Sequence, residues 1–432
     1  MKIFQAGEKG FERYLSSMEE RGEQGSLRLE RKVRSILENV RKRGDKALIH
    51  YTQVFDGLQI PIHQLRVKRS EVESAYKRVP PDFLKTLKRA TRRIQKFHDL
   101  QGKRLISSLK RKEKGIELEQ MMRPLERVGV YVPGGKASYP STVLMAAIPA
   151  KEAGVREILM VTPPQEGGIS PAVLVAADLA GVDQVYRVGG VQAVAALAYG
   201  TKSIPKVDKI VGPGNQYVAT AKRLVFGEVD IDMVAGPSEI VIVSDGSTPS
   251  SFVAADLISQ AEHDEMALAI LITNSEAFGR EVKKEVEKQL LSLRRRKVAS
   301  QSLNRRGAIL IVKNLEQAMQ FVNRIAPEHL ELAVSKPLAL MRSVRHAGAV
   351  FLGSYTPEAV GDYMAGPNHI LPTAGTARFS SPLGVEDFVK RTNVVSVTRG
   401  ALQGFDKDVK RFANWEGLEG HYRAVQVRVE KS

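Results

Sequence analysis

From residue 128 onward, short apolar runs alternate with helical segments, and this alternation limits the fold more than any other feature of the chain. The runs expected to form buried strands are residues 128–132, 157–161, 185–188, 209–211, 239–243 and 268–273. The helical segments that follow them are residues 141–153, 171–179, 191–199, a stretch from Asn215, 250–261 and 277–293. Strand–helix alternation of this kind favours parallel sheets with helices on both faces. The sequence therefore predicts an α/β fold.

The flanking regions differ from this pattern. Residues 1–120 are highly charged and predicted to be mostly helical, because residues 27–44 and 81–100 carry apolar side chains at three- and four-residue spacing. Residues 354–384 are crowded with Gly, Pro and Ser, which predicts a long functional loop. The tail beyond residue 386 has helix, short strand and helix signals, and we expect it to dock elsewhere.

One pentapeptide occurs twice in the alternating region. Val-Ala-Ala-Asp-Leu stands at 175–179 and again at 253–257, each time in a predicted helix between two predicted strands. Chance recurrence in Ala-rich helices and an internal duplication of a nucleotide-binding-like half both account for it.

The net charge of +17 raises the question of nucleic-acid binding. Basic clusters lie at residues 88–93, 110–114 and 294–297, but no aromatic side chains are interleaved with them as a stacking platform requires. Their helical spacing is more typical of solvated faces, so we expect no nucleic-acid partner. No apolar run approaches the roughly 18 residues of a membrane helix, and the start lacks a signal-peptide core. We expect a cytoplasmic protein without a membrane partner.

The chain contains no cysteine. A thiolate nucleophile, a disulfide and a cysteine-ligated metal are therefore all excluded. An enzyme of this sequence that oxidises an aldehyde must use water or hydroxide as its nucleophile.

Four of the eight histidines lie close in sequence to carboxylates, which indicates a site built from nitrogen and oxygen groups. Gln260 and His263 stand three residues apart at the end of the predicted helix 250–263, so they share one face. Such a pair either seats a metal or simply hydrogen-bonds at a helix end. Taken alone, the pair favours the second reading.

The pair Glu328 and His329 follows Pro327, a residue suited to the first turn of a helix. A helix N-terminus stabilises negative charge, so we expect Glu328 to stay ionised. His329 titrates near neutrality and suits a general base. The alternative is a capping glutamate beside a surface histidine.

Two more acid–histidine pairs lie farther along the chain. Asp362 and His369 flank Gly366-Pro367 in the predicted loop, where polar side chains are more often functional than on a surface helix. Glu416 and His421 lie five residues apart, so no single helical face presents both, and only docking of the tail would bring them to a site.

The chain has no Gly-x-Gly-x-x-Gly fingerprint and no P-loop. Three glycine turns instead lead into predicted helices, at 134–135, 189–190 and 212–214. Each turn either offers backbone amides to a phosphate or serves only as a tight turn of an α/β sheet.

Taken together, these segments resemble the histidinol dehydrogenase family, whose members catalyse the last step of histidine biosynthesis. The matching motifs are Val-Gly-Val-Tyr-Val-Pro-Gly-Gly (128–135), Arg-Val-Gly-Gly-Val-Gln-Ala (187–193), Gly-Pro-Gly-Asn (212–215), Ala-Gly-Pro-Ser-Glu (235–239), Gln-Ala-Glu-His-Asp (260–264), Ala-Pro-Glu-His-Leu (326–330) and Gly-Asp-Tyr-Met-Ala-Gly-Pro-Asn-His (361–369). The motifs follow the family's order, and the resemblance as a whole runs from about residue 30 to the tail.

The resemblance implies oxidation of L-histidinol by two NAD, with water, to L-histidine. It implies Glu328 and His329 as the proton-handling pair, and one zinc ion held by Gln260, His263, Asp362 and His421. The residues it implies for substrate binding are Ser238, Gln260, His263, His329, Asp362, His369, Glu416 and His421, and those for NAD are Tyr131, Gln192 and Asn215.

The resemblance also implies two incomplete Rossmann-like parallel-sheet domains with a helical N-terminal arm and a C-terminal tail, in an intertwined homodimer. The expected division is 1–30 as the arm, 31–127 plus 238–385 as the first domain, 128–237 as the NAD-binding domain and 386–432 as the tail. The tail is expected to carry Glu416 and His421 into the neighbouring subunit's site. From the residues alone, a zinc hydrolase and a basic nucleic-acid-binding protein remain the alternatives.

Overall fold

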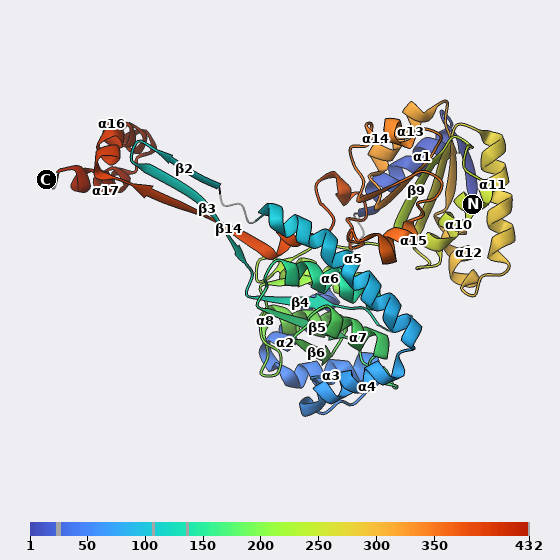
Figure 1. Ribbon diagram of the computed structural model, residues 1–432, viewed down its shortest axis with the longest axis horizontal. Helices are drawn as coiled ribbons and strands as arrows, with labels where there is room; N and C mark the ends of the chain where they lie inside the picture. The colour runs from blue at the N-terminus through green and yellow to red at the C-terminus, as the bar shows by residue number, and fades with distance from the viewer. Residues whose placement is uncertain (23–26, 106–108, 135–137, 431–432) are drawn as a thin grey trace.

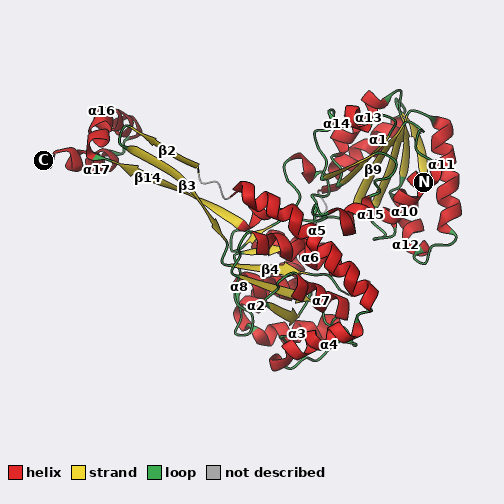
Figure 2. Ribbon diagram, viewed as in Figure 1, coloured by secondary structure: helices red, strands yellow, loops and turns green. Residues whose placement is uncertain are grey.

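The computed structural model describes residues 1–22, 27–105, 109–134 and 138–430, and these residues form three β-sheets. Two sheets, each covered by helices, make up the body, and the third is part of a narrow arm that projects from it (Figures 1 and 2). Among the described residues, no helix combines the length and the apolar character needed to cross a membrane.

The first sheet has six parallel strands in the spatial order β1-β11-β10-β9-β12-β13. Its strands are β1 (Lys2–Gln5), β9 (Glu239–Ser244), β10 (Leu268–Thr273), β11 (Ala308–Ile311), β12 (His329–Ala333) and β13 (Ala349–Leu352). One face packs on α10 (Ser250–Ala261), α11 (Glu276–Leu290) and α12 (Arg296–Arg305). The other face packs on α1 (Lys9–Glu19), α13 (Leu315–Ile325) and α14 (Pro337–Met341).

The second sheet has five parallel strands in the order β6-β5-β4-β7-β8. Its strands are β4 (Arg127–Tyr131), β5 (Glu157–Thr162), β6 (Gln184–Arg187), β7 (Lys209–Val211) and β8 (Asp230–Ile231). Helices α4 (Arg69–Arg78), α5 (Pro81–Leu105), α6 (Pro140–Glu152) and α7 (Pro171–Leu179) cover one face. Helices α2 (Leu27–Arg43), α3 (Asp45–Asp56), α8 (Gly190–Tyr199) and α9 (Gln216–Val225) cover the other.

Both sheets are wound in the same way. Numbered along the chain from β4, the second sheet runs 3-2-1-4-5, and numbered from β9 the first sheet runs 3-2-1-4-5 with β1 added at its edge. This order is that of a Rossmann sheet lacking its sixth strand. The predicted α/β class with two incomplete Rossmann-like sheets is confirmed, and the shared winding agrees with the duplication alternative for the repeated pentapeptide.

The assignment of the N-terminal third to a sheet requires a correction. Residues 31–127 were expected to belong with 238–385, but helices α2 to α5 pack on the second sheet. The helical N-terminal segment is present as α1, yet β1 precedes it and pairs with β11 of the first sheet. Apolar periodicity identifies the buried face of a helix but not the sheet that buries it, which explains the error.

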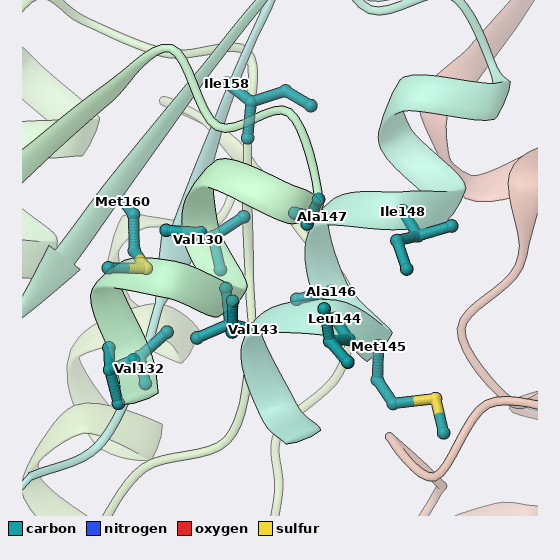
Figure 3. Close-up of a cluster of buried hydrophobic side chains, with 14 of the residues drawn as sticks. Val130, Val132, Val143, Leu144, Met145, Ala146, Ala147, Ile148, Ile158 and Met160 are labelled. Atoms are coloured by element: carbon teal, nitrogen blue, oxygen red, sulfur yellow. The ribbon is translucent and has the colours of Figure 1, made fainter. Parts of the chain in front are cut away.

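The core of the second sheet is densest around α6. This helix is buried on all sides because it lies between the sheet and helices α5 and α7. Figure 3 shows Val143 beside Val130 and Val132 of the sheet, with Met145 and Ile148 pointing away from them. A helix packed on every side shows no polar stripe, which is why its sequence is almost uniformly apolar.

The arm was only partly expected. Strands β2 (Leu109–Glu113) and β3 (Ile116–Pro124) lie in a stretch predicted to be helical, and they pair with β14 (Val389–Val397) in an antiparallel sheet. Helices α16 (Arg399–Glu416) and α17 (Glu419–Glu430) pack on each other at its tip (Figure 1). The strands were missed because they are charged and exposed, so their apolar alternation is weak.

The arm exposes large apolar side chains in this single chain. Trp415 is 92% exposed, Phe412 71% and Val395 64%. Exposed apolar side chains concentrated on one projection are typical of a surface that another protein covers.

A buried ion pair fixes the turn after β7. Lys222 of α9 and Asp232 form a salt bridge with side chains 2% and 1% exposed. Lys222 Nζ also donates to the carbonyl of Gly212 (2.9 Å), and Asp232 Oδ2 accepts from the Gly212 amide (2.7 Å). Gly212 has φ +109°, and a Cβ there would lie 2.2 Å from the Tyr131 carbonyl oxygen. The pair therefore holds a turn that only glycine tolerates.

Replacing Lys222 by Met should leave the Asp232 carboxylate buried without its counter-charge. We expect a loss of about 3–5 kcal/mol in the free energy of unfolding, measured by urea unfolding. The control Lys103→Met removes the partner of Asp99 in an exposed i,i+4 pair and should change stability by less than about 1 kcal/mol. Equal stability of the two variants would show that the buried pair is not formed in solution.

Candidate functional site

The predicted catalytic residues converge at the amino-terminal edge of the first sheet. Glu239 begins β9, His329 begins β12 and Gln260 lies in the last turn of α10. The loop with α15 (Glu358–Val360) and a π-helical turn (Gly361–Ala365) supplies Asp362. Ligands of open α/β sheets usually bind at the carboxyl ends of the strands, so this placement is unusual.

Glu239 organises this edge, a role that no local sequence pattern indicates. Its carboxylate accepts from Arg21 Nε (2.5 Å) and Nη2 (2.8 Å), in a pair whose side chains are 3% and 2% exposed. Its amide donates to Glu328 Oε2 (2.8 Å), and its carbonyl lies 2.9 Å from His329 Nδ1. One peptide segment therefore orients both members of the predicted pair.

His329 is held in one tautomer. A carbonyl oxygen can only accept, so Nδ1 carries the hydrogen and Nε2 is left with a lone pair. Nε2 is buried and has no hydrogen-bond partner among the described residues, with Glu358 Oε1 at 3.8 Å and Asp362 Oδ1 at 4.0 Å. Burial lowers the pKa of His329, and the nearby Asp362 opposes that shift. The result is a neutral imidazole that presents a free base.

The expected setting of Glu328 is wrong. Pro327 does not start a helix: Ala326 ends α13 in the left-handed conformation (φ +49°), and β12 begins at His329. Glu328 is buried, and burial raises its pKa well above the ordinary 4.5, with Glu239 and Asp362 adding to the rise. The Glu239 amide opposes this shift but does not outweigh it. The ionised carboxylate of Glu328 is therefore a stronger base than that of an exposed glutamate.

His263, Glu358 and Asp362 form a compact donor set. One candidate ligand atom from each lies within 4.8 Å of the others. Gln260 is fully buried beside them, and with its amide oriented to suit its neighbours the nitrogen donates to Glu358 Oε1 (2.7 Å) and Oε2 (2.5 Å). Burial lowers the pKa of His263, which favours the neutral ring that a metal requires.

The remaining predicted residues divide into two groups. His369 lies beside Asp362, with its Nδ1 3.0 Å from the Asp362 carbonyl and 3.8 Å from Oδ1. Ser238 directly precedes Glu239. Glu416 and His421, in contrast, lie exposed on the tip of the arm, far from this edge within the same chain (Figure 1).

Sequence reasoning missed a row of buried carboxyl groups behind His329. Glu358 is 2% exposed, and its amide donates to Glu331 Oε1 (2.8 Å). Glu331 in turn shares a hydrogen bond with Asp256, whose pKa burial raises to about 6. Glu331 lies in β12, a strand buried on both faces, and Glu358 begins the short helix α15. The local sequence does not indicate that either side chain is buried.

The predicted nucleotide residues meet at the carboxyl edge of the second sheet. The Tyr131 hydroxyl accepts from the Gly190 amide (3.0 Å), and Gln192 is fully buried in the first turn of α8. Asn215 caps α9 by accepting from the amides of Tyr217 (3.0 Å) and Val218 (3.2 Å). Gly135, part of the first predicted glycine turn, lies outside the described residues.

Residues beside this edge contact the loop that follows β13 of the first sheet. Asn368 Nδ2 donates to the carbonyl of Met145 in α6 (2.7 Å). Burial raises the pKa of Tyr363, the charges of three nearby carboxylates add to the rise, and Tyr139, just before α6, adds a smaller electrostatic contribution. The carboxyl edge of one sheet and the amino edge of the other thus meet.

Comparison with known proteins gives one consistent answer. Residues 19–429 match the family model described as histidinol dehydrogenase. The chain is 52% identical over 432 residues to histidinol dehydrogenase of Syntrophotalea carbinolica, covering 100% of both chains. It is 54% identical over 403 residues to that of Bacillus cereus, covering 93% of each. The crystal structure of histidinol dehydrogenase from Elizabethkingia anophelis superposes with a TM-score of 0.92 at 37% identity, covering 100% of this chain and 98% of the other.

Replacing Glu328 by Gln should change how stability depends on pH. Because the folded pKa of Glu328 is raised, the folded state binds its proton more tightly, and stability falls as pH rises above about 4.5. Gln keeps an oxygen for the Glu239 amide but cannot ionise. We expect the variant to be more stable than the wild type at pH 8 and equally stable near pH 4.

Urea unfolding at pH 4, 6 and 8 measures this difference. Glu166→Gln, on an exposed loop, is the matched control and should show no pH-dependent difference from the wild type. A Glu328→Gln protein less stable than the wild type at pH 8 would mean that the folded state prefers the ionised carboxylate.

Proposed function

The chain belongs to the histidinol dehydrogenase family, and on that premise we propose how its residues divide the work of an NAD-dependent oxidation of histidinol. The observation that carries the proposal is the free, buried Nε2 of His329 beside the donor set of His263, Glu358 and Asp362. Nothing at this edge favours the hydrolase or nucleic-acid alternatives over the activity of the family.

We propose that Gln260, His263 and Asp362 hold one zinc ion, with His421 of the partner subunit as the fourth protein ligand. The donor set fits zinc, because nitrogen and carboxylate oxygen are among its ordinary ligands and the chain has no cysteine. Bound there, the ion supplies Lewis acidity and a fixed orientation for the substrate. Glu358 holds the Gln260 amide, in the manner of residues that orient metal ligands.

In the first oxidation, His329 Nε2 accepts the proton of the substrate hydroxyl, and bound NAD would supply the acceptor for the hydride. The hydrogen bond from Nδ1 to the Glu239 carbonyl keeps Nε2 as the basic nitrogen. Burial keeps the ring neutral before the reaction begins. Ser238, His369 and Glu416 of the partner subunit are our candidates for positioning histidinol beside it.

In the second oxidation, water adds to the aldehyde, as the absence of cysteine requires. Glu328 accepts a proton from that water. Its raised pKa makes the ionised carboxylate a stronger base than an exposed glutamate, and this suits the task at near-neutral pH. A second bound NAD would supply the acceptor for the hydride of the hydrate, and loss of the two hydroxyl protons would leave the carboxylate of histidine.

We propose that NAD binds at the carboxyl edge of the second sheet. The winding of that sheet reverses between β4 and β7, and dinucleotides bind where this reversal occurs. Tyr131 ends β4, and Gly212 follows β7. The N-termini of α8 and α9, with Gln192 and Asn215, offer amides for the phosphates.

We propose a homodimer in which each arm reaches the other subunit's site. The arm exposes its apolar side chains, and it carries Glu416 and His421 away from the edge where the remaining site residues gather. A second copy would cover this surface and complete both sites.

Two substitutions separate the base from the metal ligands. His329→Asn should lower kcat about 10²- to 10⁴-fold while zinc per subunit stays unchanged, because His329 is not among the proposed ligands. His263→Asn should lose zinc. Metal analysis and NADH formed per histidinol consumed, expected to be two in the wild type, measure both effects. Zinc loss in His329→Asn would make that histidine a ligand, and full zinc in His263→Asn would remove it from the ligand set.

Mixing two inactive variants tests the shared site. If His421 serves the partner, a heterodimer of His329→Asn and His421→Asn subunits holds one site with both defects and one with neither. We expect activity to return, toward about half the wild-type value per heterodimer, after subunit exchange through mild denaturation and refolding. Two His329→Asn preparations treated in the same way are the control. Exchanged heterodimers that stay inactive would place His421 in its own subunit's site or outside any site.

A further inference from the structure

Several polar atoms of helices α3 and α8 are buried without a hydrogen-bond partner in the described part of the chain. They are Thr52 Oγ1, Asp56 Oδ2 and both amide atoms of Gln192. Thr52 is 1% exposed and Gln192 is fully buried. Buried polar atoms are nearly always paired in folded proteins, so a group of unpaired ones indicates a ligand that pairs them.

Helix α3 runs antiparallel to α8, and this arrangement brings Thr52 and Asp56 of α3 toward Gln192 at the start of α8. At one end, the carboxylate of Asp45 accepts from Ser203 Oγ (2.9 Å), just beyond the C-terminus of α8. At the other end, the charge of Asp56 reaches Tyr131, whose hydroxyl accepts from the Gly190 amide. Thr52 and Asp56, four residues apart, share one face of α3. The C-terminal turn of α3 therefore lies beside the start of α8.

The protein itself provides little to stabilise a carboxylate at position 56. Asp56 is the last residue of α3, where the negative end of the helix dipole disfavours an anion. Burial alone raises the pKa of Asp56 to about 6. A group that donates hydrogen bonds would offset both effects, and the ligand must therefore present donors to this carboxylate.

Among the described residues, the second strand of the second sheet does not end on an acid, and Glu166 follows it four residues later on an exposed loop. In Rossmann sheets an Asp or Glu about 20 residues after the glycine turn, near the end of the second strand, binds a ribose hydroxyl of NAD. Here the second strand, β5, ends at Thr162 and continues into Pro163-Pro164. Asp56 reaches the same carboxyl edge from a helix on the sheet's face.

We propose that Asp56, assisted by Thr52, accepts hydrogen bonds from the two hydroxyls of the adenosine ribose of NAD. This contact would favour NAD over NADP, which carries a phosphate on that ribose. A ribose carries two adjacent hydroxyls that match the two oxygens of a carboxylate. A phosphate on one of them would remove a donor and bring its negative charge against the carboxylate. The inference rests on the proposed placement of NAD at this edge.

The test compares Asp56→Asn and Asp56→Ala with the full-length wild-type enzyme, varying NAD or NADP at saturating histidinol. The KM for NAD should rise on the order of 10- to 100-fold, as for a lost charge-assisted hydrogen bond. The preference for NAD over NADP in kcat/KM should fall at least about tenfold. The KM for histidinol and the zinc content should not change. Glu38→Gln, which removes an exposed carboxylate from α2, should match the wild type.

Stability gives a second readout. Removing a carboxylate that is partly buried and unpaired should leave the apo-protein as stable as the wild type or more so, whereas a structural role for Asp56 predicts a loss. Asp56→Asn with unchanged KM for NAD and unchanged cofactor preference would overturn the proposal. So would an apo-protein of reduced stability whose NAD preference is retained.

Gln192→Ala separates this inference from the placement of NAD. If Gln192→Ala raises the KM for NAD and Asp56→Asn does not, the ribose contact is refuted while the binding edge stands. If neither variant affects NAD, the placement of NAD itself is refuted, and the ribose contact with it.

Discussion

The peptide unit of Glu239 is the constraint on which the amino-terminal edge of the first sheet depends. Its amide and carbonyl orient Glu328 and His329, and its buried carboxylate is held by Arg21 from the N-terminal segment. Loss of either charge would leave the other buried without a partner, which is strongly destabilising. Arg21 lies 218 residues away in sequence, so the geometry of the base is tied to the docking of the chain's beginning.

The two similarly wound sheets serve different roles because opposite edges of them meet. The second sheet contributes its carboxyl edge, where winding reversal and helix N-termini suit a dinucleotide. The first contributes its amino edge and the loop that carries Asp362. At the corresponding carboxyl edge of the first sheet, Asp245 accepts from the amides of Ser247 and Ser335, each at 3.0 Å. Two sheets with the same strand order therefore contribute different edges, the carboxyl edge of one and the amino edge of the other, to the proposed site.

Much of the local structure was predictable, since it depends on local periodicity. The bounds expected for residues 171–179 and 250–261 are those of α7 and α10. The packing of helices α2, α3, α4 and α5 on the second sheet could not be predicted, because the apolar pattern of an amphipathic helix does not indicate which sheet it covers. The clustering of Gln260, His263 and Asp362 followed from resemblance to a family, whereas Glu358 and Asp56 became visible only through burial and missing partners.

The amino-acid sequence by itself determined the strand–helix alternation from residue 128 to residue 273 and, through the absence of cysteine, a chemistry of nitrogen, oxygen and water. Only the tertiary structure decided the basicity of these groups. The sequence predicts Glu328, next to a proline, to be an anion at a helix start, whereas burial beside β9 raises its pKa well above the ordinary value. The tautomer of His329 is set by a carbonyl 90 residues away. Such properties depend on desolvation and on partners distant in sequence, which arise only when the chain is packed.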